Sequence, residues 1–163
     1  MAENEFRHSV GWRCHLKVIY ELLRKKIFFA QRSMGTMFVL KAGRQFSPSL
    51  GLRKQVVSHG EVELIVELAA WTITGAGIKS TSVEMRTNQL DKSLARLHGC
   101  NIIKATMCRR GRLKIKLSKG ITIDVLPVAT FGEGTSLGAW MLFKREKCIL
   151  CCLRNRLVYA PIE

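Results

Sequence analysis

Acidic residues are scarce in this chain. Of its 163 residues, 12 are Asp or Glu and 27 are Lys or Arg, which leaves a formal net charge of +15. The excess is spread along the chain: residues 1–98 contain 15 basic and 8 acidic side chains (+7), and residues 99–163 contain 12 and 4 (+8). This distribution excludes a basic tail on a neutral domain, and it predicts a partner of negative charge.

Long apolar runs are also missing. The longest uncharged, apolar-rich stretch is Leu68 to Ile78, far short of the ~20 residues that a membrane-spanning helix needs. The first five residues are polar and acidic (Met-Ala-Glu-Asn-Glu), whereas a secretory signal begins with basic residues and continues with apolar ones. We therefore expect a cytoplasmic protein with no membrane contact.

The sequence contains no recognisable catalytic or cofactor motif. The four histidines show no recurring spacing with Ser, Cys or carboxylates: they are His8, His15, His59 and His98. Gly75-Ala76-Gly77 is too short for a dinucleotide fingerprint and does not lead clearly into a helix. We predict a protein that is not an enzyme and has no cofactor and no catalytic residues.

The cysteines favour reduced thiols over a metal site. They are Cys14, Cys100, Cys108, Cys148, Cys151 and Cys152. Zinc needs about four ligands, and the only ones near the Cys148-x-x-Cys151-Cys152 cluster are Cys100, Cys108 and His98, whose spacing matches no zinc knuckle. A strand would place Cys148 and Cys152 on one face and Cys151 on the other. We expect no bound metal and mostly buried, reduced thiols, as in a cytosolic protein.

Short apolar runs rich in β-branched and aromatic residues predict strands in the first half. The expected strands are 18–20, 27–29, 37–40 and 61–70, with 43–51 as a loop or an edge strand.

One helix is clear from its periodicity. Leu90, Leu94 and Leu97 recur at i, i+4 and i+7, which places them on one helical face. Thr87 or Asn88 is the expected N-cap, and Gly99 is expected to end the helix.

After Gly99 the pattern is that of antiparallel strands. We predict strands at 101–108, 112–117, 121–126, 139–143, 148–153 and 157–160, with a Gly/Ser/Thr loop at 128–137. The fold class is therefore α+β, mostly β, with antiparallel meanders and one clear helix near 87–98. Trp140 lies in an apolar strand and is expected in the core.

Two parts of the chain look alike. Residues 24–27 (RKKI) and 112–115 (RLKI) each precede a turn and a strand, at an offset of 88 residues. We expect a single domain. It would consist of two related β-meander halves, about 10–70 and 99–160, joined by a helix-containing segment.

Basic residues gather in one predicted hairpin. They are Arg109, Arg110, Arg112, Lys114, Lys116 and Lys119. Alternation places Leu113, Ile115 and Leu117 on one face of the strand and the basic side chains on the other. This surface is the predicted partner-binding site, and either an acidic protein or a phosphate backbone would suit it. The hairpin lacks the aromatic side chains on which single-stranded nucleic acid stacks.

Residues 97–142 resemble a small bacterial β-rich domain family found near polymorphic-toxin loci and discussed as immunity-like. The shared pattern is Leu97-x-Gly99, a strand, Gly111-x-Leu113-x-Ile115, a turn at Gly120, an apolar strand, and a segment ending in Ala139-Trp140. Gly138 stands where the pattern has glutamate, and the strand after Arg112 is more basic. The match covers about a third of the chain and transfers no catalytic residue.

The resemblance implies that the protein binds and neutralises a cognate toxin. With a charge of +15 such an inhibitor would meet an acidic toxin surface, and the loop 128–137 would join the hairpin as a contact. A β-sheet protein that binds nucleic acid through the hairpin 109–119 remains the alternative.

Overall fold

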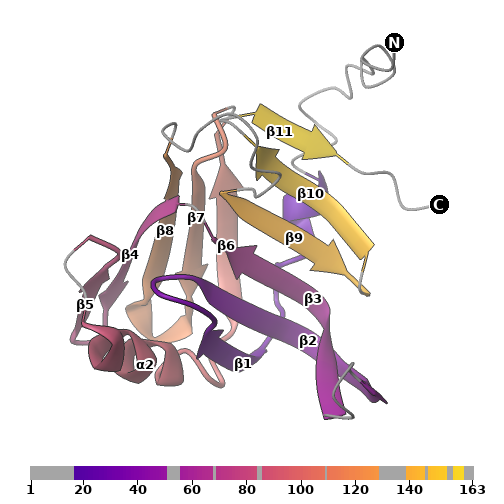
Figure 1. Cartoon of the computed structure of the whole chain (residues 1–163), viewed down its shortest axis with the longest axis horizontal. Helices are drawn as coiled ribbons and strands as arrows, with labels where there is room; N and C mark the ends of the chain where they lie inside the picture. Colours follow the sequence, from indigo (N-terminus) through magenta and orange to yellow (C-terminus); the bar gives the residue numbers. More distant parts are fainter. Residues whose placement is uncertain are drawn as a thin grey trace.

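A computed structural model shows two antiparallel β-sheets that pack against each other, with one helix closing one end (Figure 1). It describes residues 17–50, 56–67, 69–83, 86–108, 110–128, 139–145, 147–153 and 156–159. The predicted mostly β, α+β fold class with antiparallel meanders is confirmed.

The first sheet joins strands from both ends of the chain. Its strand order is β1-β2-β3-β9-β10-β11. The strands are β1 (Ile27–Arg32), β2 (Phe38–Leu50), β3 (Val56–Val66), β9 (Trp140–Lys144), β10 (Lys147–Leu153) and β11 (Arg156–Tyr159).

The second sheet is built from the middle of the chain, in the order β5-β4-β8-β7-β6. Its strands are β4 (Ala69–Gly75), β5 (Ile78–Thr81), β6 (Ile102–Met107), β7 (Leu113–Leu117) and β8 (Thr122–Pro127). The helix α2 (Thr87–Ala95) connects β5 to β6 and packs against β1 and β5, and a short 3-10 turn, η1 (Ser118–Gly120), connects β7 to β8.

The hydrophobic core lies between the two sheets. In β7 buried and exposed residues alternate, and the buried side chains Leu113, Ile115 and Leu117 belong to this core. The predicted core position of Trp140 is confirmed, since its side chain is fully buried. Leu90, Leu94 and Leu97 are buried too, so the predicted helical face is the one that packs on the core.

The two sheets repeat one topology. Three consecutive strands form a meander in each sheet, β1-β2-β3 and β6-β7-β8. The strand that follows each meander crosses to the other sheet: β4 pairs with β8, and β9 pairs with β3. Each half of the chain therefore completes the sheet that the other half began.

Paired hydrogen bonds relate the two halves at an offset of 75 residues. Ile27 N–H donates to the Cys100 carbonyl (2.8 Å), and Ile102 N–H donates to the Lys25 carbonyl (2.9 Å). The offset of 88 residues expected from the sequence is wrong, because Arg24 precedes β1 whereas Arg112 precedes β7, the second strand of its meander.

Two buried tryptophans occupy equivalent places where the chain crosses between the sheets. The Trp71 indole N–H donates to the Thr36 carbonyl (2.9 Å), and the Trp140 indole N–H donates to the Gly111 carbonyl (2.7 Å). Each bond ties a crossing strand to the turn between the first two strands of a meander. A buried indole N–H left without a partner would cost about 1–3 kcal/mol, so these bonds fix both crossings.

Some local predictions were wrong. Residues 17–20 are helical, not a strand, because Val18, Ile19 and Leu22 are buried on one side while Tyr20 is 55% exposed. The predicted strand 61–70 is two strands, with β3 ending at Val66 and β4 beginning at Ala69.

Of the two alternatives predicted for 43–51, the edge strand is confirmed for residues 43–50, since β2 continues to Leu50 and beyond Ala42 pairs with β3 alone. One further boundary differs from prediction. The N-cap of α2 is Arg86, not Thr87 or Asn88, and it forms no side-chain capping bond. The predicted loop 128–137 and the cysteine Cys14 lie outside the described residues, except for Val128.

Gly75 ends β4 where that strand meets the β7–β8 turn. It has φ +107°, and a Cβ at this position would lie 2.1 Å from the Gly120 carbonyl oxygen. We expect Gly75→Ala to destabilise the protein by about 1–3 kcal/mol more than Gly35→Ala in urea unfolding. Gly35 is the matched control, because it also has a positive φ (+58°) but open space around its Cβ position. Equal losses would contradict this close approach.

Candidate partner-binding face

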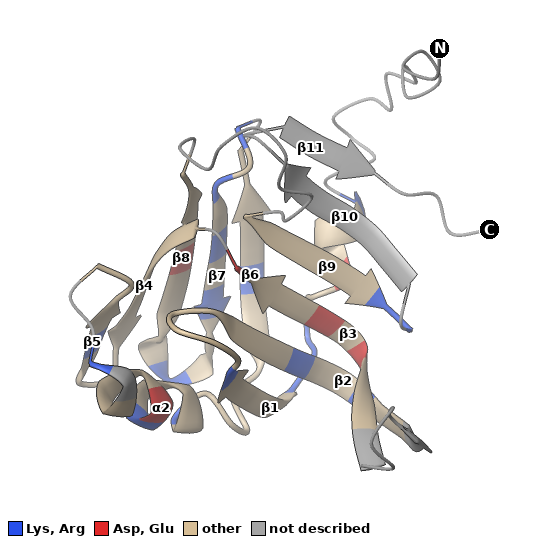
Figure 2. Ribbon diagram, in the orientation of Figure 1, with Lys and Arg blue, Asp and Glu red and all other residues tan. Residues whose placement is uncertain are grey.

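The outward surface of the second sheet is basic. We call it the basic face; its charged side chains are Lys79, Lys104, Arg112, Lys114, Lys116 and Asp124. Figure 2 shows the blue segments on β6 and β7 and the red segment on β8. Lys114 and Lys116 point outward because their neighbours Leu113, Ile115 and Leu117 fill the core.

Cross-strand register sets like charges beside one another on this face. Lys116 pairs with Lys104 on β6 and with Thr122 on β8. Lysines directly opposite in an antiparallel pair repel each other. Within the described part of the chain, neither Lys104 nor Lys116 forms an ion pair. A bound anion would therefore relieve a repulsion that the folded chain itself does not.

Arg112 is neutralised within the sheet. Its Nε and Nη2 donate to the two carboxylate oxygens of Asp124 at 2.9 and 2.6 Å. These hydrogen bonds lower the pKa of Asp124 and raise that of Arg112, and the nearby Lys114 also lowers the pKa of Asp124. Asp124 therefore stays ionised at neutral pH, and the free positive charge on this face comes from the lysines.

The structure separates the six predicted partner-binding residues. Arg110 lies in the β6–β7 turn, and Lys119 lies in the β7–β8 turn with φ +64°, at the opposite end of β7. Lys114, Lys116 and the ion-paired Arg112 share the outward face between these turns. Arg109 lies outside the described residues.

Sequence reasoning missed two lysines of the basic face. Lys104 on β6 and Lys79 on β5 are exposed and extend the row that runs through Lys116. Their place depends on strand register and on the crossing of β4, which no local pattern reveals. Alternation within 102–107 was the one local signal for Lys104, and a register shift between Ile102 and Lys104 obscures it.

The outward surface of the first sheet has different chemistry at the equivalent positions. Phe29, Val39 and Ile65 stand where the second sheet has Lys104, Lys114 and Asp124, and they are half-buried. The repeated topology therefore presents a basic surface on the second sheet and, on the first, apolar side chains around the Lys41–Glu63 pair.

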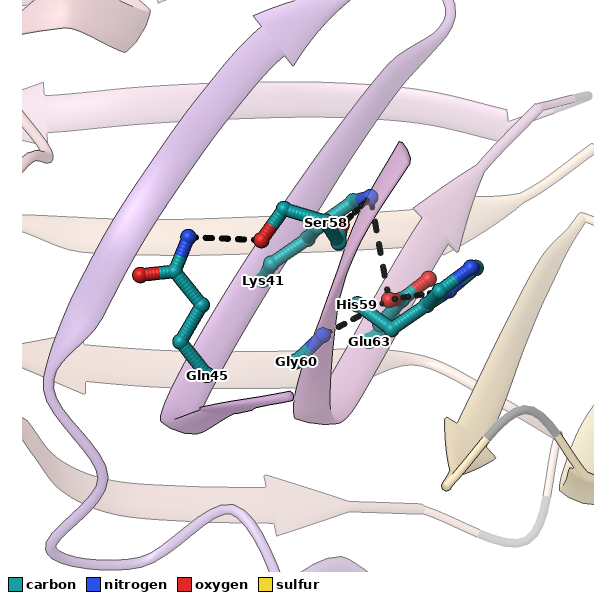
Figure 3. Close-up of polar contacts among 6 residues, drawn as sticks. All are labelled: Lys41, Gln45, Ser58, His59, Gly60 and Glu63. Carbon is teal, nitrogen blue, oxygen red and sulfur yellow. Dashed lines mark hydrogen bonds and ion pairs between the residues drawn. The ribbon is translucent and has the colours of Figure 1, made fainter. Parts of the chain in front are cut away.

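A polar network lies on that first sheet at the β2–β3 pair (Figure 3). Glu63 Oε1 accepts the Gly60 N–H (2.9 Å) and lies 3.3 Å from His59 Nδ1 and 3.7 Å from Lys41 Nζ. Lys41 Nζ also donates to the Ser58 carbonyl and lies 5.2 Å from the centre of the Phe29 ring. The Lys41 and Glu63 side chains are 11% and 12% exposed, so each compensates the burial of the other.

We expect Glu63→Gln to destabilise the protein by about 1–3 kcal/mol at neutral pH, because Lys41 would lose its carboxylate. The matched control is Glu21→Gln, whose partner Lys144 lies 3.0 Å away in a more exposed pair and whose loss should cost less than about 1 kcal/mol. Urea unfolding measures both. A smaller loss for Glu63→Gln than for the control would show that the network adds no stability.

His98 and Asp91 both line a pocket of about 310 Å³, but each already has a partner. Asp91 pairs with Arg32 at 3.1 Å, and His98 Nε2 lies 3.1 Å from the Ala30 nitrogen and 3.2 Å from its carbonyl oxygen. These contacts tie α2 to β1, since all four residues belong to or flank those elements. His98 and Asp91 therefore help to hold the helix against the first sheet.

Cys100 and Cys108 are free cysteines, of which Cys100 is buried and Cys108 is exposed. The side chains of the cluster on β10 (Cys148, Cys151 and Cys152) lie outside the description. Among the described residues, no three His, Cys, Asp or Glu side chains are placed to hold a metal ion.

Neither a protein-family model, nor a curated protein, nor a solved structure matches this chain. In the described residues no helix has the length and apolar character needed to cross a membrane.

Proposed function

We propose that this protein is a non-catalytic binding protein that docks an acidic protein partner on its basic face. The observation that supports this most is the row of exposed lysines without ion-pair partners in the described chain, Lys104, Lys116 and Lys79, on the outward face of the second sheet. Such a row attracts an anionic surface over long range. The affinity would be highest where carboxylates of the partner lie between the opposed lysines.

The character of the face favours a protein over a nucleic acid. Its described outward positions hold lysines and threonines, such as Thr72, Thr74 and Thr106, with no aromatic ring for base stacking. Nucleic-acid binding through the hairpin 109–119 is the second candidate, because the same lysines would attract phosphate groups.

The resemblance of residues 97–142 to immunity-like domains gives the partner a class. We propose an immunity-type role in the cytoplasm, in which the acidic partner is a cognate toxin that this protein covers and inhibits. The exposed free thiol of Cys108 fits a reducing compartment.

The test uses two double variants with the same change in net charge. Lys114→Glu/Lys116→Glu reverses the centre of the basic face, and Lys17→Glu/Lys92→Glu reverses two exposed lysines elsewhere. Wild type and both variants are immobilised and exposed to extract of the native cells, and a captured protein is purified and its affinity measured. We expect at least about tenfold weaker binding, or about 1.4 kcal/mol, for the first variant alone.

Two outcomes would overturn this proposal. Equal weakening by both variants would show that net charge, not the basic face, governs binding. Tight binding of a generic RNA or DNA duplex, with log K falling by about 0.7–0.9 per phosphate contacted as log salt rises, would favour the second candidate. For the immunity-type role, the captured protein must be toxic when expressed alone and harmless when expressed with this chain.

A further inference from the structure

A pocket of about 430 Å³ opens where four parts of the chain meet. The β1–β2 turn, the segment between β3 and β4, the end of β5 and the end of β8 form it. Its lining is mostly apolar: Met34, Gly35, Thr36, Met37, Glu67, Ala69, Ala70, Ser82, Val83 and Val128. Three of these apolar side chains protrude at its rim, with Met34 70%, Val83 84% and Val128 39% exposed.

Glu67 is the one charged side chain among the described lining residues. Its main chain is fixed, because its N–H donates to the Ala139 carbonyl at 3.0 Å. Its Oε2 atom is buried and has no hydrogen-bond partner, which holds for no other buried side-chain oxygen or nitrogen in the described chain. A buried carboxylate oxygen without a donor is costly, and none of the described lining residues donates to it.

The pocket adjoins the basic face. Ala70 lines the pocket and pairs directly with Leu126 on β8, and Leu126 is 51% exposed. Asp124, two residues before Leu126, holds Arg112 on the basic face. A protein lying across the second sheet would therefore reach the pocket at its β4–β8 end.

We propose that this pocket receives an arginine side chain of a partner protein, with the guanidinium pairing with the carboxylate of Glu67. The aliphatic part of the arginine would lie against Met34, Val83 and Val128. Methionine adapts its shape to such a stem, and removing these rim side chains from water adds to the affinity.

Charge and shape both favour arginine. The chain has a net charge of +15, but the charged group in this pocket is a carboxylate. A partner that is acidic overall would therefore complement both sites if it placed one positive side chain at the pocket. Guanidinium keeps its charge and is less strongly hydrated than an ammonium group, so it enters an apolar pocket at lower cost than lysine. The apolar side chains at the rim are exposed. A partner protein whose surface carries the arginine would cover this rim as it docks.

The pocket and the basic face can be tested apart. This inference does not rest on the immunity-type role, and the probe is a small molecule that does not span the basic face. N-acetyl-arginine methylamide is titrated into full-length protein labelled at its methionine methyl groups, and the Met34 and Met37 signals are followed by NMR. The neutral isostere N-acetyl-citrulline methylamide is titrated in parallel, both to about 10 mM, which covers a Kd near 1 mM.

We expect the arginine probe to bind at least about tenfold more tightly than the citrulline probe, or about 1.4 kcal/mol. Glu67→Gln should remove that preference, whereas Asp91→Asn, which deletes an acidic group on α2, should keep it. Equal shifts from both probes would show an apolar site without charge selection. No shift from either probe, or a preference that survives Glu67→Gln, would overturn the proposal.

Stability as a function of pH distinguishes an open ligand site from a structural role for Glu67. Burial raises the pKa of Glu67, and a carboxyl whose folded-state pKa lies above its unfolded value costs stability once pH exceeds that unfolded value. For an open site we therefore expect wild type to lose stability relative to Glu67→Gln as pH rises above the ordinary glutamate range. A Glu67→Gln variant less stable than wild type at neutral pH would show that Glu67 stabilises the fold and would contradict a site left open for a ligand.

Discussion

The exchange of one strand between the two halves is the constraint on which the rest of this structure depends. Because β4 leaves its own meander to pair with β8, and β9 leaves its own to pair with β3, neither sheet is complete without the other half of the chain. The indole bonds of Trp71 and Trp140 fix these crossings at equivalent turns. The shared core follows from them, since the inner faces of both sheets meet in one apolar layer.

The two sheets share one topology but present different outward residues. On the first sheet the outward positions of Phe29, Val39 and Ile65 surround the Lys41–Glu63 pair, which is largely removed from water. On the second sheet the equivalent positions are polar and basic, and the opposed lysines Lys104 and Lys116 are both exposed. This difference between equivalent positions is the reason that we propose the basic face, and not the outward surface of the first sheet, as the partner-binding surface.

Much of the fold was predictable where the signal is local. The alternation of Leu113, Ile115 and Leu117 and the spacing of Leu90, Leu94 and Leu97 identified a strand and a helix, because each pattern reports one buried face. The run 18–20 misled, since β-branched residues there pack as a helical turn against the core. The offset of 88 misled too, since three identical residues carry less information than the register of whole strands.

The sequence by itself determined most of the elements, the sign of the charge and the outward direction of Lys114 and Lys116, because side-chain alternation and composition are properties of neighbouring residues. Only the tertiary structure decided which strands are adjacent. Pairing across the chain placed Lys104 beside Lys116, gave Arg112 to Asp124, and enclosed Glu67 among apolar side chains from four separate segments. These contacts join residues far apart in the chain, and long-range register, which no local pattern encodes, brings them together.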